Sequence, residues 1–169
     1  MLPRRIALYY SVLWARTLLL LMLGFDLFRS FRFAEWFVCT SCELEPIGRS
    51  DSSSDAIHEP TGERVEIKSG HKIQWRNGRY ACCFDNLDRH KRDGVATSCY
   101  VLIVFDLEGI SDDMIRYFVI PSDETPDGGF LEIPVLSGDS DWLDYECSLY
   151  ELPKKVGEAI DDSTSESDE

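Results

Sequence analysis

Polar and apolar residues alternate along residues 63–69, the pattern of a strand with one face in the core. Residues 54–58 form a second, shorter strand-like run before it. Between the two runs lie Glu59, Pro60, Thr61 and Gly62, residue types that favour tight turns. The pattern therefore predicts an antiparallel hairpin.

A second hairpin is predicted directly downstream. Residues 71–76 and 79–84 are strand-like, and Asn77-Gly78 between them suits a type I′ turn, which needs positive φ at both positions. Residues 86–93 then predict a helix of about two turns, because Asp85 can cap its start and Gly94 follows its end.

The next segment predicts the centre of a sheet. Residues 100–105 are continuously apolar, as in a strand that is buried on both faces. Residues 115–121 predict one more strand. Upstream, the aromatic cluster at residues 33–37 predicts a helix that ends near Val38.

The two ends of the chain differ from this middle part. Residues 139–152 carry apolar side chains at near-helical spacing and predict a peripheral helix. Residues 157–169 are acidic, rich in Ser and Thr and free of aromatic residues, which predicts a disordered tail. We therefore expect a hydrophobic N-terminal helix in residues 1–30, one domain in 31–156 and a tail.

Residues 6–28 leave several interpretations open. The run is long enough to span a membrane, but Arg16 near its middle is costly there, by roughly 2.5–3.5 kcal/mol on insertion scales. The segment could associate with a membrane, could pack on the domain, or could precede a native start at Met22. Localisation is accordingly expected to be cytoplasmic, with membrane association as the alternative.

Charge is distributed unevenly along the chain. The formal net charge is −14, with 17 basic and 31 acidic residues. Residues 64–92 nevertheless hold eight basic and three acidic residues, whereas residues 93–169 hold three basic and twenty acidic. Since phosphate contacts dominate affinity for nucleic acid, this predicts a DNA-facing strip on an anionic body. A solvated basic face is the alternative. The anionic surface, with Arg favoured over Lys, suggests a salt-rich cytosol such as that of a halophilic archaeon.

The first hairpin also carries candidate chemistry. Its ends bring Asp55 beside Glu66 and Lys68, and residues two apart on a strand share a face. Two carboxylates suit a hard cation such as Mg²⁺, and a lysine beside it could orient a water or offset charge on a phosphate. These residue types predict phosphodiester hydrolysis.

Asp55 followed by Glu66-Ile67-Lys68 resembles the D…(D/E)xK signature of the PD-(D/E)xK nuclease superfamily, which includes restriction endonucleases and archaeal Holliday-junction resolvases. Ser54 stands where the name of that superfamily has proline. The resemblance covers roughly residues 32–121. It implies an α/β (α+β) fold with a restriction endonuclease-like core, a mixed central sheet flanked by helices in the order αβββαβ.

The resemblance also implies a site and a reaction. Asp55, Glu66 and the backbone of Ile67 would bind Mg²⁺ or Mn²⁺, Lys68 would serve the attacking water, and Glu35 on the first helix would join the catalytic group. The implied activity is that of an endonuclease acting on DNA. The implied partners are DNA and a second copy of the chain in a homodimer. The basic residues expected to contact DNA are Lys72, Arg76, Arg79, Arg89 and Arg92. The alternative is a non-catalytic DNA-binding or membrane-anchored interaction module on the same fold.

The six cysteines offer a weaker metal hypothesis. Cys39-x-x-Cys42 is half of a zinc site, but the adjacent pair Cys82-Cys83 does not supply the second C-x-x-C. Thiols in predicted strands, such as Cys99, are usually small core residues. We therefore expect no structural zinc.

Overall fold

The computed structural model describes residues 31–47, 54–70, 73–76, 79–85, 87, 96–106, 113, 115–125, 130–134 and 141–166. Its elements are α2 (Phe31–Cys42), β1 (Glu45–Pro46), β2 (Ala56–His58), β3 (Glu63–Gly70), β4 (Ile73–Arg76), β5 (Arg79–Asp85), β6 (Cys99–Phe105), β7 (Ile115–Pro121), η2 (Ser122–Glu124), β8 (Phe130–Pro134), η3 (Asp141–Tyr145), β9 (Glu146–Cys147) and α3 (Leu152–Glu166).

A mixed sheet of six strands forms the centre of the fold, in the order β1-β2-β3-β6-β7-β9. Strands β3 and β6 are parallel, and the other neighbouring pairs are antiparallel. A second sheet, β4-β5-β8, is antiparallel throughout. The fold is therefore α+β with a mixed central sheet, as the sequence predicted at this level.

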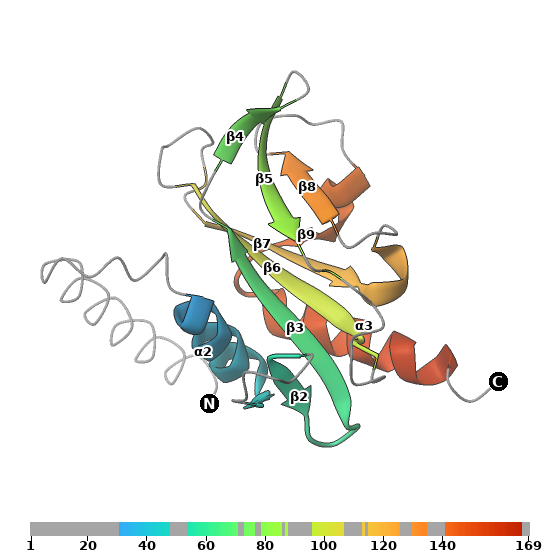
Figure 1. Ribbon diagram of the computed structural model, residues 1–169. Helices are drawn as coiled ribbons and strands as arrows, with labels where there is room; N and C mark the ends of the chain where they lie inside the picture. The colour runs from blue at the N-terminus through green and yellow to red at the C-terminus, as the bar shows by residue number, and fades with distance from the viewer. Residues whose placement is uncertain are drawn as a thin grey trace, which may run out of the picture.

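Strand β6 is buried on both faces because each face has its own hydrophobic core. Its odd-numbered residues pack with α2, α3 and the apolar residues of β3. Its even-numbered residues pack with β5 and β8 of the second sheet. Helices thus cover one face of the central sheet, and the small sheet covers the other (Figure 1). We expected helices to flank the sheet, and the second sheet is the departure from that expectation.

The two predicted hairpins are confirmed. In the first, Ala56 pairs with Val65 and His58 with Glu63. The amides of Thr61 and Gly62 donate to the His58 carbonyl at 3.2 and 2.8 Å. Gly62 has a φ of 79°, a conformation that residues with a Cβ rarely adopt. In the second hairpin, Arg76 pairs with Arg79 across the predicted turn.

Helix α2 ends where the backbone turns left-handed. Glu43 has a φ of 58°, and the amide of Leu44 donates to the Cys39 carbonyl at 2.9 Å. This is the bond pattern that commonly satisfies the last carbonyls of a helix. The helix continues to Cys42, past the end near Val38 that the sequence predicted.

The prediction of a peripheral helix over residues 139–152 is wrong. The chain instead forms the short 3₁₀ helix η3 and then β9, which pairs with β7 at the sheet's edge. Trp142, Leu143 and Tyr145 pack on the core beneath the small sheet. Leu149 and Leu152 pack on the opposite, helical side. The near-helical spacing arose because one segment supplies side chains to two cores.

The prediction of a disordered tail from residue 157 is also wrong for the residues that the structure describes. Helix α3 runs to Glu166, and Val156, Ala159 and Ile160 are buried in the helical core. Glu151 accepts hydrogen bonds from the backbone amide and hydroxyl of Ser148 at 3.0 and 2.7 Å, which organises the turn before the helix. Because the segment is mostly acidic, its narrow apolar stripe was not recognised as the buried side of a helix. Residues 167–169 lie outside the described part.

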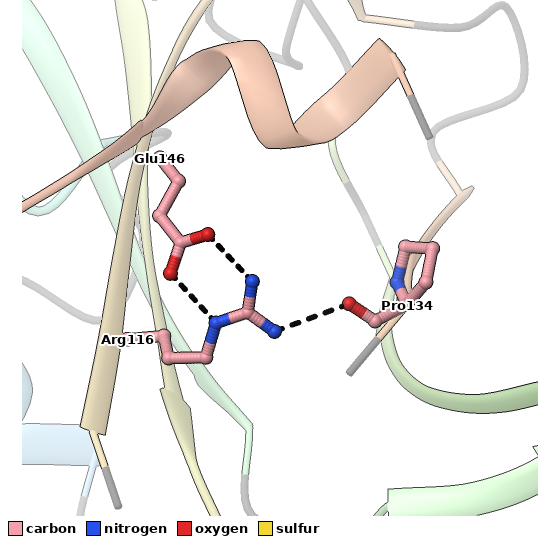
Figure 2. Close-up of polar contacts among 3 residues, drawn as sticks. All are labelled: Arg116, Pro134 and Glu146. Carbon is pink, nitrogen blue, oxygen red and sulfur yellow. Dashed lines mark hydrogen bonds and ion pairs between the residues drawn. The ribbon is translucent and has the colours of Figure 1, made fainter. Parts of the chain in front are cut away.

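A buried arginine connects the two sheets. Arg116 on β7 donates two hydrogen bonds to the Glu146 carboxylate, at 2.6 and 2.5 Å, and one to the Pro134 carbonyl at 3.3 Å (Figure 2). Its guanidinium lies 5.2 Å from the centre of the Phe118 ring. Planar bidentate pairing of this kind holds both partners in one orientation. The contact therefore holds β9 and β8 to β7.

Some predictions fall on residues that the structure does not describe. These are the hydrophobic segment 6–28 within residues 1–30, and the helix predicted over 86–93, of which only Leu87 is described. Leu87 is buried against the second sheet and belongs to no helix. Among the described helices, none is long and apolar enough to cross a membrane.

Candidate active site

Asp55 lies where the pairing between β2 and β3 ends. Its backbone amide donates to the carbonyl of Val65, the residue paired with Ala56, at 3.1 Å. Its side-chain oxygen Oδ2 accepts the backbone N–H of Ile67 at 2.8 Å. One hydrogen bond thus holds Asp55 to Val65, and the other holds its side chain to the middle of the Glu66-Ile67-Lys68 motif.

Asp55 lies just outside the regular ladder, because the described pairing of β2 with β3 begins at Ala56 and Val65. The hydrogen bond from the Ile67 amide places the Asp55 carboxylate beside the Glu66–Ile67 peptide.

Glu66 and Lys68 form an ion pair, with Lys68 Nζ 2.6 Å from Glu66 Oε1. The Lys68 side chain is 29% exposed and that of Glu66 only 6%. Both residues alternate along β3 with Val65 and Ile67, which face α2. The ion pair therefore lies on the opposite face of the central sheet, the face that the small sheet covers. A largely buried carboxylate beside a more accessible ammonium could receive a cation or a phosphate from the solvent side.

The Ile67 carbonyl is directed toward the same edge as Asp55. In a strand, the N–H and C=O of one residue point to the same side, and the Ile67 N–H points to Asp55. Strand β2 pairs only with residues 63–65, so among the described strands this side of residues 66–70 has no neighbour. The Ile67 carbonyl oxygen is thus on the same edge of β3 as the Asp55 carboxylate.

Glu35 approaches the site from α2. It is half-buried, and burial is the largest cause that raises its carboxyl pKa above the ordinary 4.5. The Asp55 carboxylate raises the pKa further, Arg32 lowers it, Glu66 raises it and Lys68 lowers it. The Asp55 carboxylate thus acts on the Glu35 carboxyl more strongly than the Glu66 carboxylate does.

The donors present suit a hard divalent cation. Asp55, Glu66 and the Ile67 carbonyl supply oxygen only, which is the ligand type that Mg²⁺ prefers, and Mg²⁺ usually keeps several waters. Within the described residues, no group of three or more His, Cys, Asp or Glu side chains is arranged to hold a metal ion. A site of two carboxylates, one carbonyl and waters does not require such a group.

The residues expected to contact DNA are mostly outside the described part. Lys72, Arg89 and Arg92 are not described, and Arg76 and Arg79 are described only as a backbone pair at the end of the β4–β5 hairpin. This hairpin begins directly after β3, and β5 passes over Gly70. The two arginines therefore follow the motif at the tip of an element that packs on its strand.

Arg32 lowers the pKa of Glu35, and it was not among the residues predicted for the site. It is exposed and lies three residues before Glu35 on α2, on the same side of the helix. The spacing Arg32-x-x-Glu35 is the signal that could have revealed it once Glu35 was a candidate.

The cysteines behave as core residues. All six are free thiols, and four of them, Cys39, Cys82, Cys99 and Cys147, are buried. Burial raises the pKa of Cys39 to about 11 and those of Cys42 and Cys82 to about 12. Thiolates, the reactive and metal-binding form, are therefore disfavoured at these positions.

Comparison with known proteins gives no family for the chain. No protein-family model matches the sequence, and no curated protein matches it.

Proposed function

We propose that this protein is a metal-dependent endonuclease that hydrolyses phosphodiester bonds in DNA, with a site of the PD-(D/E)xK type. The observation that supports the proposal is the hydrogen bond to Asp55 from the amide of Ile67, which lies within the Glu66-Ile67-Lys68 motif. A chance Glu-x-Lys match would not require an upstream aspartate to be fixed against it.

Each residue has a distinct role in the proposed site. Asp55, Glu66 and the Ile67 carbonyl hold the cation. Bound Mg²⁺ or Mn²⁺ would supply Lewis-acid polarisation of the phosphate and a more acidic water. Lys68 orients the attacking water and offsets negative charge that develops on the phosphate. Glu35, beside Asp55, adds a third carboxylate that could accept a proton or bind a water of the cation.

The order of elements supports the same proposal. Helix α2 precedes three antiparallel strands, β1, β2 and β3, and β6 then lies parallel beside β3. This agrees with the first four elements and the parallel strand of a core in the order αβββαβ if the β4–β5 hairpin is an insertion; the second helix of that order is not among the described residues. Such an enzyme would act in restriction, or in DNA repair or recombination.

The direct test is cleavage by the full-length protein. Linear, branched and single-stranded DNA would be incubated with Mg²⁺ or Mn²⁺ and, separately, with a chelator. We expect metal-dependent cleavage of at least one substrate. Asp55→Asn, Glu66→Gln and Lys68→Met should each reduce the rate about 100-fold or more, since each removes a group that acts on the transition state.

A matched control is Glu158→Gln, which removes one exposed carboxylate on α3 that pairs with Lys154 and Lys155. It should cleave like the wild type. Binding of DNA without cleavage under all these conditions would favour the non-catalytic module instead. Cleavage that survives in Glu66→Gln would assign the activity to another site.

A further inference from the structure

The exposed face of α2 next to the candidate site carries one cation that has no role in the proposed site. The buried side of this helix includes Ala34, Phe37, Val38 and Cys39, which belong to the core shared with β3. Arg32, Glu35 and Cys39 form a row along the helix, with spacings of three and four residues. Within this row Cys39 is buried, Glu35 is half-buried and Arg32 is exposed.

The Asp55 carboxylate raises the pKa of both Glu35 and Cys39, in each case as the second cause after burial. Arg32 in turn acts on Glu35. The row therefore runs from the interior near Cys39, past Glu35 beside the site, to an exposed guanidinium.

The direction of the helix determines on which side of the site Arg32 lies. The C-terminal end of α2 leads into β1, which pairs with β2 at Ile57 and Ala56. The other end of α2 points toward the end of β3 that continues into the β4–β5 hairpin (Figure 1). Arg32 is in the first turn of α2 and is thus at this end of the helix.

Charge in the site makes such a cation useful. Glu35, Asp55 and Glu66 are three carboxylates, and the Lys68 ammonium is already paired with Glu66. The three carboxylates repel a nucleic-acid strand that approaches them. One bound metal ion and the Lys68 ammonium offset this repulsion only in part. A guanidinium at the solvent edge could bind a phosphate with two parallel hydrogen bonds.

We propose that Arg32 is a substrate-binding residue that holds the phosphate next to the scissile phosphate on the strand being cut. This inference rests on the proposed nuclease function. The ligand class is a nucleic-acid backbone, recognised by its charge and geometry and independently of sequence.

The test is binding of a short DNA that the wild type cleaves, with Ca²⁺ in place of Mg²⁺ so that binding is measured without turnover. Arg32→Ala should weaken binding about tenfold and reduce the slope of log affinity against log salt by about 0.7–0.9, the loss of one phosphate contact. Arg32→Lys should keep the slope but lose part of the affinity, since the charge remains and the fork does not.

The position of the contact can be found with substrates that carry one neutral methylphosphonate near the cut. For the wild type, one of these should bind as weakly as the unmodified DNA binds to Arg32→Ala. At that position the variant should show no further loss. Lys154→Ala, which removes one exposed cation on α3, is the matched control and should leave affinity and slope unchanged.

The possible failures are distinguishable. Cleavage by the wild type with an unchanged slope and affinity in Arg32→Ala would overturn the role of Arg32 and leave the nuclease proposal intact. A lower turnover number at unchanged affinity would mean that Arg32 acts on Glu35 and not on DNA, which also overturns it. A wild type that neither binds nor cuts DNA would overturn both proposals.

Discussion

The ion pair between Lys68 and Glu66 places a positive charge on the carboxylate that the proposed cation would use. A cation that binds Glu66 must share this carboxylate with the ammonium or displace it. The lysine therefore has two opposite effects, since it opposes cation binding and assists hydrolysis.

Lys68→Met should separate these effects. Cleavage should be lost, whereas affinity for Mg²⁺ or Mn²⁺, measured by calorimetry, should rise about tenfold because a like charge within ~4–6 Å is removed. Lys155→Met, which removes a cation paired with Glu158 on α3, should not change metal affinity. Weaker metal binding in Lys68→Met would contradict the proposed arrangement.

The raised pKa of Glu35 predicts that the stability of the protein depends on pH. Its folded-state pKa is raised above 4.5 by burial and then by Asp55, so folding favours the neutral form. The ionised carboxyl therefore destabilises the folded state as pH rises from below 4.5 through the raised pKa. Relative to the wild type, Glu35→Gln should gain stability over this window in chelator, as measured by urea unfolding. Added Ca²⁺ should reduce the gain, and a difference that does not vary with pH would contradict the assignment.

At the scale of elements, the position of the β4–β5 hairpin over β3 depends on Gly70. A Cβ at this position would lie 2.3 Å from Cys82 Sγ and 3.1 Å from Phe84 Cζ. Gly70→Ala should therefore cost about 1–3 kcal/mol of unfolding free energy, as overpacked sites do. Adding Cys82→Ala should recover part of this cost in a double-mutant cycle.

Gly157 on α3 is the control for this pair, because a Cβ there would meet nothing within 4 Å. Gly157→Ala should be neutral or stabilise by up to about 1 kcal/mol, since alanine favours the helix. If Gly70→Ala is equally neutral, β5 does not pass over β3 as described.

Arg116 gives a second prediction for the arrangement of elements. Arg116→Met leaves the Glu146 carboxylate without the two hydrogen bonds that hold β9 to β7. The expected loss of stability is about 1–3 kcal/mol, the cost of a partly buried polar group that loses its partner. Glu146→Leu in the same background should recover much of it, whereas equal losses in the single and double variants would show that Arg116 acts mainly through packing.

For the whole molecule, α3 decides how one core is closed. Leu152, Val156 and Ile160 are each at most 1% exposed, and they pack with α2 and the odd-numbered residues of β6. Ile160→Ala should destabilise the protein by about 2–5 kcal/mol in chemical unfolding. Deletion of residues 167–169 should have little effect. A neutral Ile160→Ala would mean that the segment is the disordered tail that its composition suggests.

Local sequence was sufficient for the features whose causes are local. The turn residues Glu59 to Gly62, the Asn77-Gly78 pair and the apolar run of β6 each act on their own neighbours, and the hairpins and the buried strand were predicted correctly. The hydrogen bond between Asp55 and the Ile67 amide also forms within this hairpin, so it depends on local sequence.

Only the tertiary structure decided what depends on distant partners. Residues 142–152 looked helical because their apolar side chains divide between two cores, and this division exists only once β9 joins the edge of the sheet. Helix α3 is stabilised by burial of a stripe too narrow to outweigh its acidic composition in a sequence analysis. The electrostatic effect of Asp55 on Glu35 depends on how α2 packs across β3, and helical spacing alone cannot specify the partner that the helix faces.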